Sequence, residues 1–188
     1  MLALAAGGGQ QGPLLAASQA TVTVFDNSKR MLELDGMIAR REGYEIELVK
    51  GDMTKALPFP DEHFDLIINP VSNCYIEDMS HLWKECWRVL KPGARLLAGL
   101  DNGMNFIVDD DEERIIHPLP FNPLRNPEQL AELTEDEGIQ FSHSYEDNLQ
   151  TMLDAGFTLK GIFSDTNSNG RLKDLGIPSF YAVYSIKL

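Results

Sequence analysis

Cysteine is scarce in this chain, with Cys74 and Cys86 the only two among 188 residues. Two cysteines twelve positions apart match neither a disulfide framework nor a metal-ligand spacing, so the sequence excludes a disulfide-stapled miniprotein and predicts no metal site. A reducing, cytoplasmic setting is the simplest expectation. No run of about 18 consecutive apolar residues is present either, and no transmembrane helix is therefore predicted.

Basic residues are also in the minority, because 16 Lys and Arg stand against 29 Asp and Glu, a formal net charge of −13. A surface of that sign repels phosphate groups, which makes nucleic acid and anionic membranes poor partners. The charge is concentrated in residues 101–150, where 13 acidic residues face only Arg114 and Arg125, a net of −11. A solvated acidic face is the simpler interpretation, and steering of a cationic ligand is the sharper one.

Hydrophobic residues make up 43% of the chain, which predicts one packed domain rather than a disordered segment. Over about the first hundred residues, short aliphatic runs alternate with helical patterns, as is typical of βαβ units and a mostly parallel sheet. The predicted strands are Leu2–Ala5, Val22–Phe25, Ile46–Val49, Phe64–Ile68 and Arg95–Leu100. Helices are predicted from about Ser28 to Arg41 and from about Asp78 to Leu90, because apolar residues recur there at three- and four-residue spacing.

The pattern changes after residue 100. Residues 101–150 combine the acidic run Asp109–Glu113 with a proline-rich stretch that disfavours regular structure, and we interpret them as an insertion. Residues 151–188 hold two apolar runs, Phe157–Phe163 and Phe180–Ile186, with no helical pattern between them. If these two strands are neighbours, they must pair antiparallel.

Glycines cluster in the segment Ala5–Gly12, between the first predicted strand and the next helix. Glycine lets a ligand approach the backbone, and the start of the helix offers free N–H groups. Asp26 ends the second predicted strand nineteen residues after Gly7, where a carboxylate can accept both hydroxyls of a ribose. Gly7, Gly9 and Gly12 match G-x-G-x-x-G, which indicates a nucleotide-type ligand; a turn selected only for tight packing is the alternative.

Three later segments extend this pattern. Gly51-Asp52-Met53 closes the third strand, Phe64–Ile68 forms the fourth, and Trp87–Leu97 links a helix to the fifth. In order and spacing they resemble the class I S-adenosylmethionine-dependent methyltransferases, especially the small-molecule type 11 branch. The resemblance implies a three-layer, Rossmann-like α/β fold with a mostly parallel seven-stranded sheet, order 3-2-1-4-5-7-6, and one antiparallel strand. It also implies methyl transfer to a small molecule by a single domain over 1–188, with a cofactor-binding half at 1–100, a substrate cap at 101–150 and a C-terminal strand pair at 151–188.

The resemblance assigns the cofactor S-adenosylmethionine to Ala5, Gly7, Gly9, Asp26, Asn27, Asp52, Met53, Asn69 and Pro70. The first three correspond to the glycine loop beside the methionine part of the cofactor. Asp26 corresponds to the residue that binds the ribose hydroxyls, Asp52 to the acceptor of the adenine amino group, and Met53 to a contact of the adenine ring. Asn69 and Pro70 correspond to the floor near the sulfonium.

Three features depart from that family. Ala3 stands where the family has an acidic residue, so one anchor of the cofactor's amino group is missing. Ala5 replaces the first glycine, a small change if its φ is negative and a costlier one otherwise. The chain also starts within the first strand, without the helices that precede it in the family. These departures leave open a truncated or degenerate domain that binds cofactor weakly or only contacts other proteins.

No sequence motif identifies the catalytic residues, and the candidates are individual side chains. His117 and His143 lie in the insertion, and a neutral imidazole there could deprotonate the acceptor. Two surface histidines are the simpler interpretation. Tyr75 could orient a nucleophile, although a half-buried tyrosine with a solvated hydroxyl is the more common case.

A nicotinamide-dependent oxidoreductase is the alternative enzyme. It depends on the G-x-G-x-x-G spacing and on Asp26. No second mononucleotide-binding half is evident in the sequence, and the Asp52-Met53 pair has no role in such an enzyme.

Overall fold

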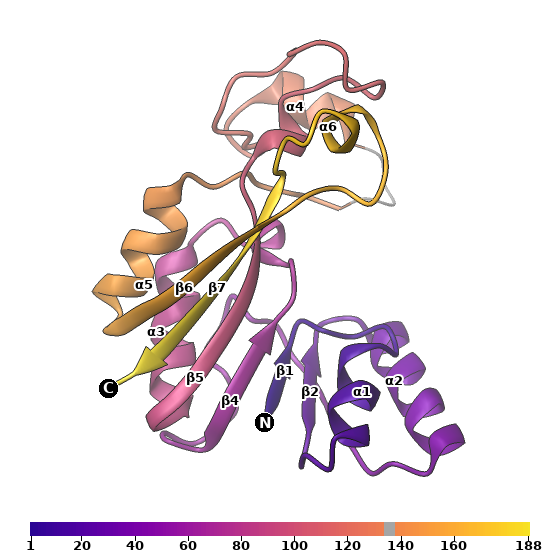
Figure 1. Cartoon of the computed structure of the whole chain (residues 1–188), viewed down its shortest axis with the longest axis vertical. Helices are drawn as coiled ribbons and strands as arrows, with labels where there is room; N and C mark the ends of the chain where they lie inside the picture. The colour runs from indigo at the N-terminus through magenta and orange to yellow at the C-terminus, as the bar shows by residue number, and fades with distance from the viewer. Residues whose placement is uncertain (134–137) are drawn as a thin grey trace.

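The structure is a computed structural model and describes residues 1–133 and 138–188 (Figure 1). The described residues form a seven-stranded sheet in the order β3-β2-β1-β4-β5-β7-β6. Its strands are β1 Leu2–Leu4, β2 Thr23–Asp26, β3 Glu47–Lys50, β4 Phe64–Asn69, β5 Leu90–Asp101, β6 Phe157–Asp165 and β7 Phe180–Lys187. Strand β7 runs antiparallel to both β5 and β6, whereas the other neighbours are parallel. The predicted fold and strand order are confirmed.

Helices cover both faces of this sheet (Figure 1). Helices α1 Gln11–Ala17 and α2 Lys29–Glu42 lie on one face, over β1 to β3. Helix α3 Met79–Val89 and the π-helical turn η3 Glu146–Gln150, which continues into α5 Thr151–Asp154, lie on the other. The remaining short helices are η1 Asn73–Tyr75, η2 Met104–Phe106, α4 Pro127–Glu132 and α6 Arg171–Asp174. No helix in the described part of the chain is long and apolar enough to span a membrane.

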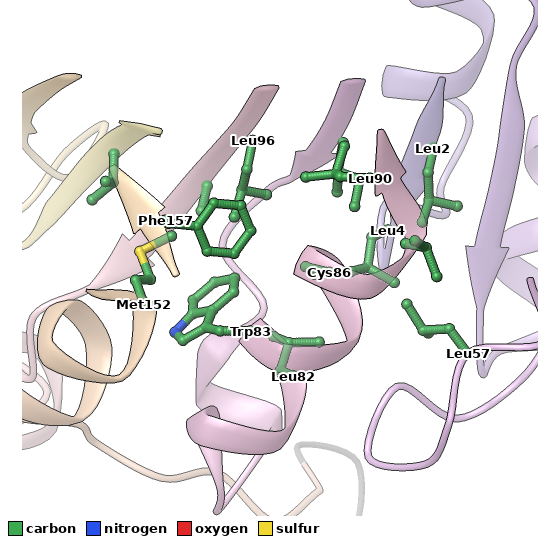
Figure 2. Close-up of a cluster of buried hydrophobic side chains, with 14 of the residues drawn as sticks. Leu2, Leu4, Leu57, Leu82, Trp83, Cys86, Leu90, Leu96, Met152 and Phe157 are labelled. Carbon is green, nitrogen blue, oxygen red and sulfur yellow. The ribbon is translucent and has the colours of Figure 1, made fainter. Parts of the chain in front are cut away.

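The larger core lies between the sheet and helix α3 (Figure 2). The apolar stripe predicted for α3 is completely buried, as the side chains of Leu82, Trp83, Cys86 and Val89 show. Burial raises the pKa of both thiols, and that of Cys74 reaches about 12, so each remains protonated at neutral pH. Both cysteines therefore act as small packing residues.

Strand β5 starts earlier than the sequence predicts. The prediction placed its start at Arg95, but Leu90 already pairs with Phe64, and a register shift follows between Phe64 and Leu66. Helix α3 ends at Val89, and Lys91-Pro92-Gly93 follows its C-cap Leu90. The fixed φ of proline fits a strand start, and Gly93, with a left-handed φ of 77°, lies within the irregular stretch where the register shifts.

The segment between β5 and η3 lies at the carboxyl ends of the strands, together with α4 and α6 (Figure 1). It contacts the loop after β4 through the Phe141 N–H, which donates to the Cys74 carbonyl at 2.7 Å, and through the Asn122 side chain, which donates to Glu77 Oε1 at 3.1 Å. Residues 134–137 of the predicted insertion lie outside the described residues. This arrangement places the segment beside the edge of the sheet where parallel α/β proteins bind ligands.

Candidate functional site

A cavity of about 670 Å³ opens at the carboxyl ends of strands β1 to β4. Such a volume suits a nucleoside-sized ligand. The described residues that line it are Ala5, Ala6, Gly7, Gln10, Gln11, Phe25, Asp26, Asn27, Ser28, Met31, Gly51, Asp52, Met53, Thr54, Pro70, Val71, Ser72, Tyr75, Gly138 and Ile139. Of the nine predicted cofactor residues, seven line the cavity, and Gly9 and Asn69 do not.

The loop after β1 has an unusual backbone. Ala5, Gly8 and Gly9 have φ values of 48°, 126° and 82°, in the region that favours glycine. Gly7 is required for a different reason, because a Cβ there would lie 2.6 Å from Met31 Cβ. The loop thus turns sharply and packs directly on helix α2.

Two carboxylates hold this glycine loop. Asp26 accepts the Gly7 N–H at 3.0 Å and, through its other oxygen, the Ser28 N–H at 2.8 Å. Asp35, a buried residue of α2, accepts the Gly8 N–H at 2.8 Å. The N–H groups of Gly7 and Gly8 therefore donate to carboxylates within the chain and are not available to a ligand.

Asp52 and Met53 follow β3 and line the cavity beside Asp26. The Asp52 Oδ1 atom accepts both the N–H and the hydroxyl of Thr54, at 2.9 and 2.7 Å. These bonds, the hydroxyl foremost, lower the pKa of Asp52, so its carboxylate is ionised at neutral pH. Both of these bonds use Oδ1. Among the described hydrogen bonds, none occupies the Oδ2 atom, so it is available to a ligand amino group.

Asn69 does not reach the cavity, which corrects the prediction that it lines the floor. Its side chain is fully buried, and its amide donates to the Leu4 carbonyl at 2.9 Å and to Ser72 Oγ at 2.8 Å. Asn69 thereby ties β4 to β1 and holds the loop that carries the lining residues Pro70 and Val71.

Gly9 also lies away from the cavity, contrary to the prediction. A Cβ at this position would lie 3.0 Å from Ile38 Cγ1 and 3.5 Å from the Leu34 carbonyl oxygen. Both atoms belong to helix α2. Gly9 therefore serves the packing of the loop against α2, and its positive φ makes glycine necessary there.

Of the three candidate catalytic residues, Tyr75 lines the cavity. Burial, with a smaller contribution from Cys74, raises the pKa of its phenol, which stays protonated at neutral pH. His143 is buried, with Nε2 3.1 Å from the Asn73 carbonyl oxygen, so its expected surface position is wrong. His117 is partly exposed, with its ring centroid 5.8 Å from that of Phe121. Neither histidine is among the described lining residues.

Several lining residues were not predicted. Gln10 and Gln11 present amides directly after the glycines, and Met31 and Thr54 add an apolar and a hydroxyl group. Gly138 and Ile139 come from the insertion, more than sixty residues beyond the other described lining residues. Gln10 and Gln11 directly follow the glycine run, so their place in the sequence could have predicted that they line the site. No sequence pattern predicts this for Ile139.

The charge of the cavity is negative. Asp26 and Asp52 are the only charged side chains among the described lining residues, which include no Lys, Arg or His. A ligand with an anionic group would find no counter-charge on the described walls, whereas a cation would be stabilised.

The left-handed backbone of Ala5 leads to a stability prediction. Substituting Ala5→Gly should raise the free energy of unfolding by about 0.5–1 kcal/mol, because relief of the αL strain of a Cβ exceeds the added freedom of the unfolded chain. Urea unfolding measures this change. Ala6→Gly is the matched control, since Ala6 is buried without a positive φ, and it should lower stability by about 0.5–1 kcal/mol. Destabilisation by both variants would contradict the strain at Ala5.

Comparisons with known proteins agree with this fold. Residues 2–98 match the family model described as "Methyltransferase domain", and the chain belongs to this methyltransferase family. It is 39% identical over 199 aligned residues to the uncharacterized methyltransferase YbaJ of Bacillus subtilis (strain 168), across 100% of this chain and 76% of YbaJ. The predicted family is confirmed.

Two further relatives are more distant. The 2-phytyl-1,4-naphtoquinone methyltransferase of Synechococcus elongatus is 36% identical over 100 residues, which are 50% of this chain and 42% of that protein. A solved S-adenosylmethionine-dependent methyltransferase from Mesorhizobium loti superposes with a TM-score of 0.73 at 19% identity, over 98% of this chain and 89% of that chain. This second likeness shows a shared fold.

Proposed function

We propose that this methyltransferase binds S-adenosylmethionine in the 670 Å³ cavity and transfers its methyl group to a small-molecule acceptor. One observation carries the proposal: the cavity has a glycine loop at the carboxyl ends of the strands, but its described lining is acidic and contains no basic side chain. That combination suits a cofactor with a sulfonium and an ammonium group.

The same observation argues against the nicotinamide alternative. A pyrophosphate needs free backbone N–H groups or basic side chains. Here the N–H groups of Gly7 and Gly8 donate to Asp26 and Asp35, and the two carboxylates would repel a phosphate. The G-x-G-x-x-G spacing is therefore compatible with two cofactor classes, and the hydrogen bonds favour the cationic one.

The chain's own residues would bind and orient the cofactor. Asp26 has lone pairs left for the ribose hydroxyls, and the ionised Asp52 can accept from the adenine amino group. Met53 offers an apolar contact for the ring, and Pro70 and Val71 exclude water near the reacting atoms. S-adenosylmethionine, when bound, supplies a methyl group on a sulfur that is already a good leaving group, so the protein mainly contributes alignment and desolvation.

The acceptor would enter between this cavity and residues 101–150, which we propose form a substrate cap. Ile139 of this segment lines the cavity, and Tyr75 presents a protonated phenol that can donate a hydrogen bond to the acceptor. The net charge of −11 in this segment favours an amine or another cationic acceptor. Because neither histidine lines the described cavity, we propose no histidine base.

Calorimetric titration of the chain tests the cofactor. S-adenosylmethionine and S-adenosylhomocysteine should both bind with a dissociation constant in the micromolar range, of order 1–100 μM, whereas reduced nicotinamide dinucleotide should give no heat of binding. Micromolar binding of the nicotinamide cofactor alone would overturn the proposal. Absence of binding by all three would favour the degenerate domain that the sequence leaves open.

A further inference from the structure

Position 3, in β1, holds alanine, where the family resemblance implies an acidic residue. Ala3 is fully buried and faces helices α1 and α2, where it packs with Val24 and Leu32. A carboxylate at this position would lie in the layer between the sheet and these helices, below the glycine loop. In this chain, the layer contains a carboxylate from another element.

That carboxylate belongs to Asp35, in the middle of helix α2. The residue is fully buried, although aspartate is rarely buried without a partner. Its Oδ2 atom accepts the Gly8 N–H at 2.8 Å. Its Oδ1 atom would lie 2.9 Å from a Cβ on Gly12, and the Val24 Cγ2 atom would lie 2.6 Å from the same Cβ. Gly12 therefore leaves the space that the Asp35 carboxylate occupies.

Asp26 and Asp35 thus each hold one residue of the glycine loop. Asp26 reaches it from strand β2 and holds Gly7, whereas Asp35 reaches it from α2 and holds Gly8. Asp26 lines the cavity, but Asp35 is not among the described lining residues. Any effect of Asp35 on a ligand must therefore pass through the loop.

We propose that Asp35 is the positioning residue of the cofactor loop, which it holds from α2 through the N–H of Gly8. The inference rests on the proposed function. Without the carboxylate, the partly buried Gly8 N–H would lose its acceptor, and the three positive-φ residues of the loop would lose the bond that holds their turn against α2.

The ionisation of Asp35 gives this role a pH signature. Burial, and to a smaller extent the negative charge of Asp26, raises the pKa of Asp35, while the N–H groups of Gly8 and Gly9 oppose the shift. Among the described residues, Asp26 is the one charged neighbour that contributes to this shift. Because the folded state binds this proton more tightly than the unfolded chain does, stability rises as the pH falls through the raised pKa. Cofactor affinity should fall in the same interval, since the protonated group loses its charge and part of its capacity as an acceptor.

The experiment compares the wild type with Asp35→Asn and Asp35→Ala by calorimetric titration with S-adenosylhomocysteine from neutral to mildly acidic pH. Asp35→Ala should weaken binding roughly 10- to 100-fold, the range for a lost hydrogen bond to a charged group. Asp35→Asn should bind more weakly than the wild type at neutral pH and should lack the loss of affinity on acidification. Glu33→Gln is the matched control, because its side chain lies on the exposed face of the same helix and should leave both readouts unchanged.

A second readout needs no ligand. In the NMR spectrum of the wild-type protein, the Gly8 amide shift should follow the titration of Asp35, and hydrogen exchange at Gly8 should be faster in Asp35→Asn. If the wild type fails to bind but Gly8 behaves as expected, the proposed function fails and the role of Asp35 in holding the loop stands. If the wild type binds and Asp35→Asn matches it in affinity and pH profile, the positioning role is overturned. If neither variant folds, the wild-type Gly8 titration decides, and a pH-independent shift overturns the proposal.

Discussion

Asp26→Ala is expected to weaken S-adenosylmethionine binding by about 1–3 kcal/mol, roughly 5- to 150-fold. The carboxylate has two functions that alanine abolishes. It presents lone pairs to the cavity. It also accepts the N–H groups of Gly7 and Ser28, which fixes the glycine loop and the start of α2 next to the carboxylate. Titration calorimetry of the purified variant measures the change.

Asp65→Ala is the matched control for this substitution. Asp65 lies near the start of β4, at the opposite end of the strand from the cavity, and forms an exposed ion pair with Lys91 at 2.8 Å. Exposed pairs of this kind contribute little, so affinity should stay at the wild-type value. Equal affinity of Asp26→Ala and wild type would remove Asp26 from the proposed site, whatever cofactor binds.

Trp83→Ala is expected to lower the free energy of unfolding by about 3–5 kcal/mol, the usual cost of truncating a buried aromatic side chain. Trp83 is 0% exposed and lies in the core between helix α3 and the sheet, with its indole facing Phe157 and Met152 (Figure 2). Its Nε1–H also donates to the Asn148 carbonyl at 3.1 Å, which links α3 to η3. Such a loss is a large part of the stability of a typical domain, so chemical denaturation should show a much lower midpoint.

Two variants separate the contributions at this position. Trp83→Phe keeps most of the apolar contact but removes the indole N–H that donates to the Asn148 carbonyl, so we expect a loss of about 1–3 kcal/mol. Leu14→Ala, at a side chain that is 72% exposed, should change stability by less than about 0.5 kcal/mol. A Trp83→Ala variant as stable as Leu14→Ala would contradict the described packing of α3.

The elements of the sheet were predictable because their signals are local. The apolar stripe of α3, the helix predicted from about Ser28 to Arg41 and the aliphatic runs of the strands each depend on residues close in sequence, and all appear in the structure. The strand order itself came from the resemblance to a family, since spacing alone does not decide which strands become neighbours. The boundary of β5 was missed because pairing with Phe64 across the sheet outweighs the local turn signal of Pro92-Gly93.

The candidate site was predictable only where its residues follow the ends of strands. Asp26, Asp52 and Pro70 lie at the last residue of a strand or within two residues after it, and parallel strands bring such positions to one edge of the sheet. The prediction for Asn69 is wrong by one position along the strand. Successive residues of a strand point to opposite faces, and the Asn69 side chain points toward β1 and Ser72. The expected surface position of His143 is wrong because the folded insertion buries this side chain against Asn73, seventy residues earlier in the chain.

By itself, the sequence determined the alternation of strands and helices, the acidic character of the chain and the glycine loop with Asp26 nineteen residues beyond it. These are properties of composition and of short-range periodicity. Only the tertiary structure decided which carboxylates hold the loop, that Ala5 has a left-handed backbone, and that the described walls of the cavity contain no basic group. Asp35 shows the physical reason. It holds the loop through a contact between residues 27 positions apart in the chain, and a local sequence pattern does not predict a contact over that separation.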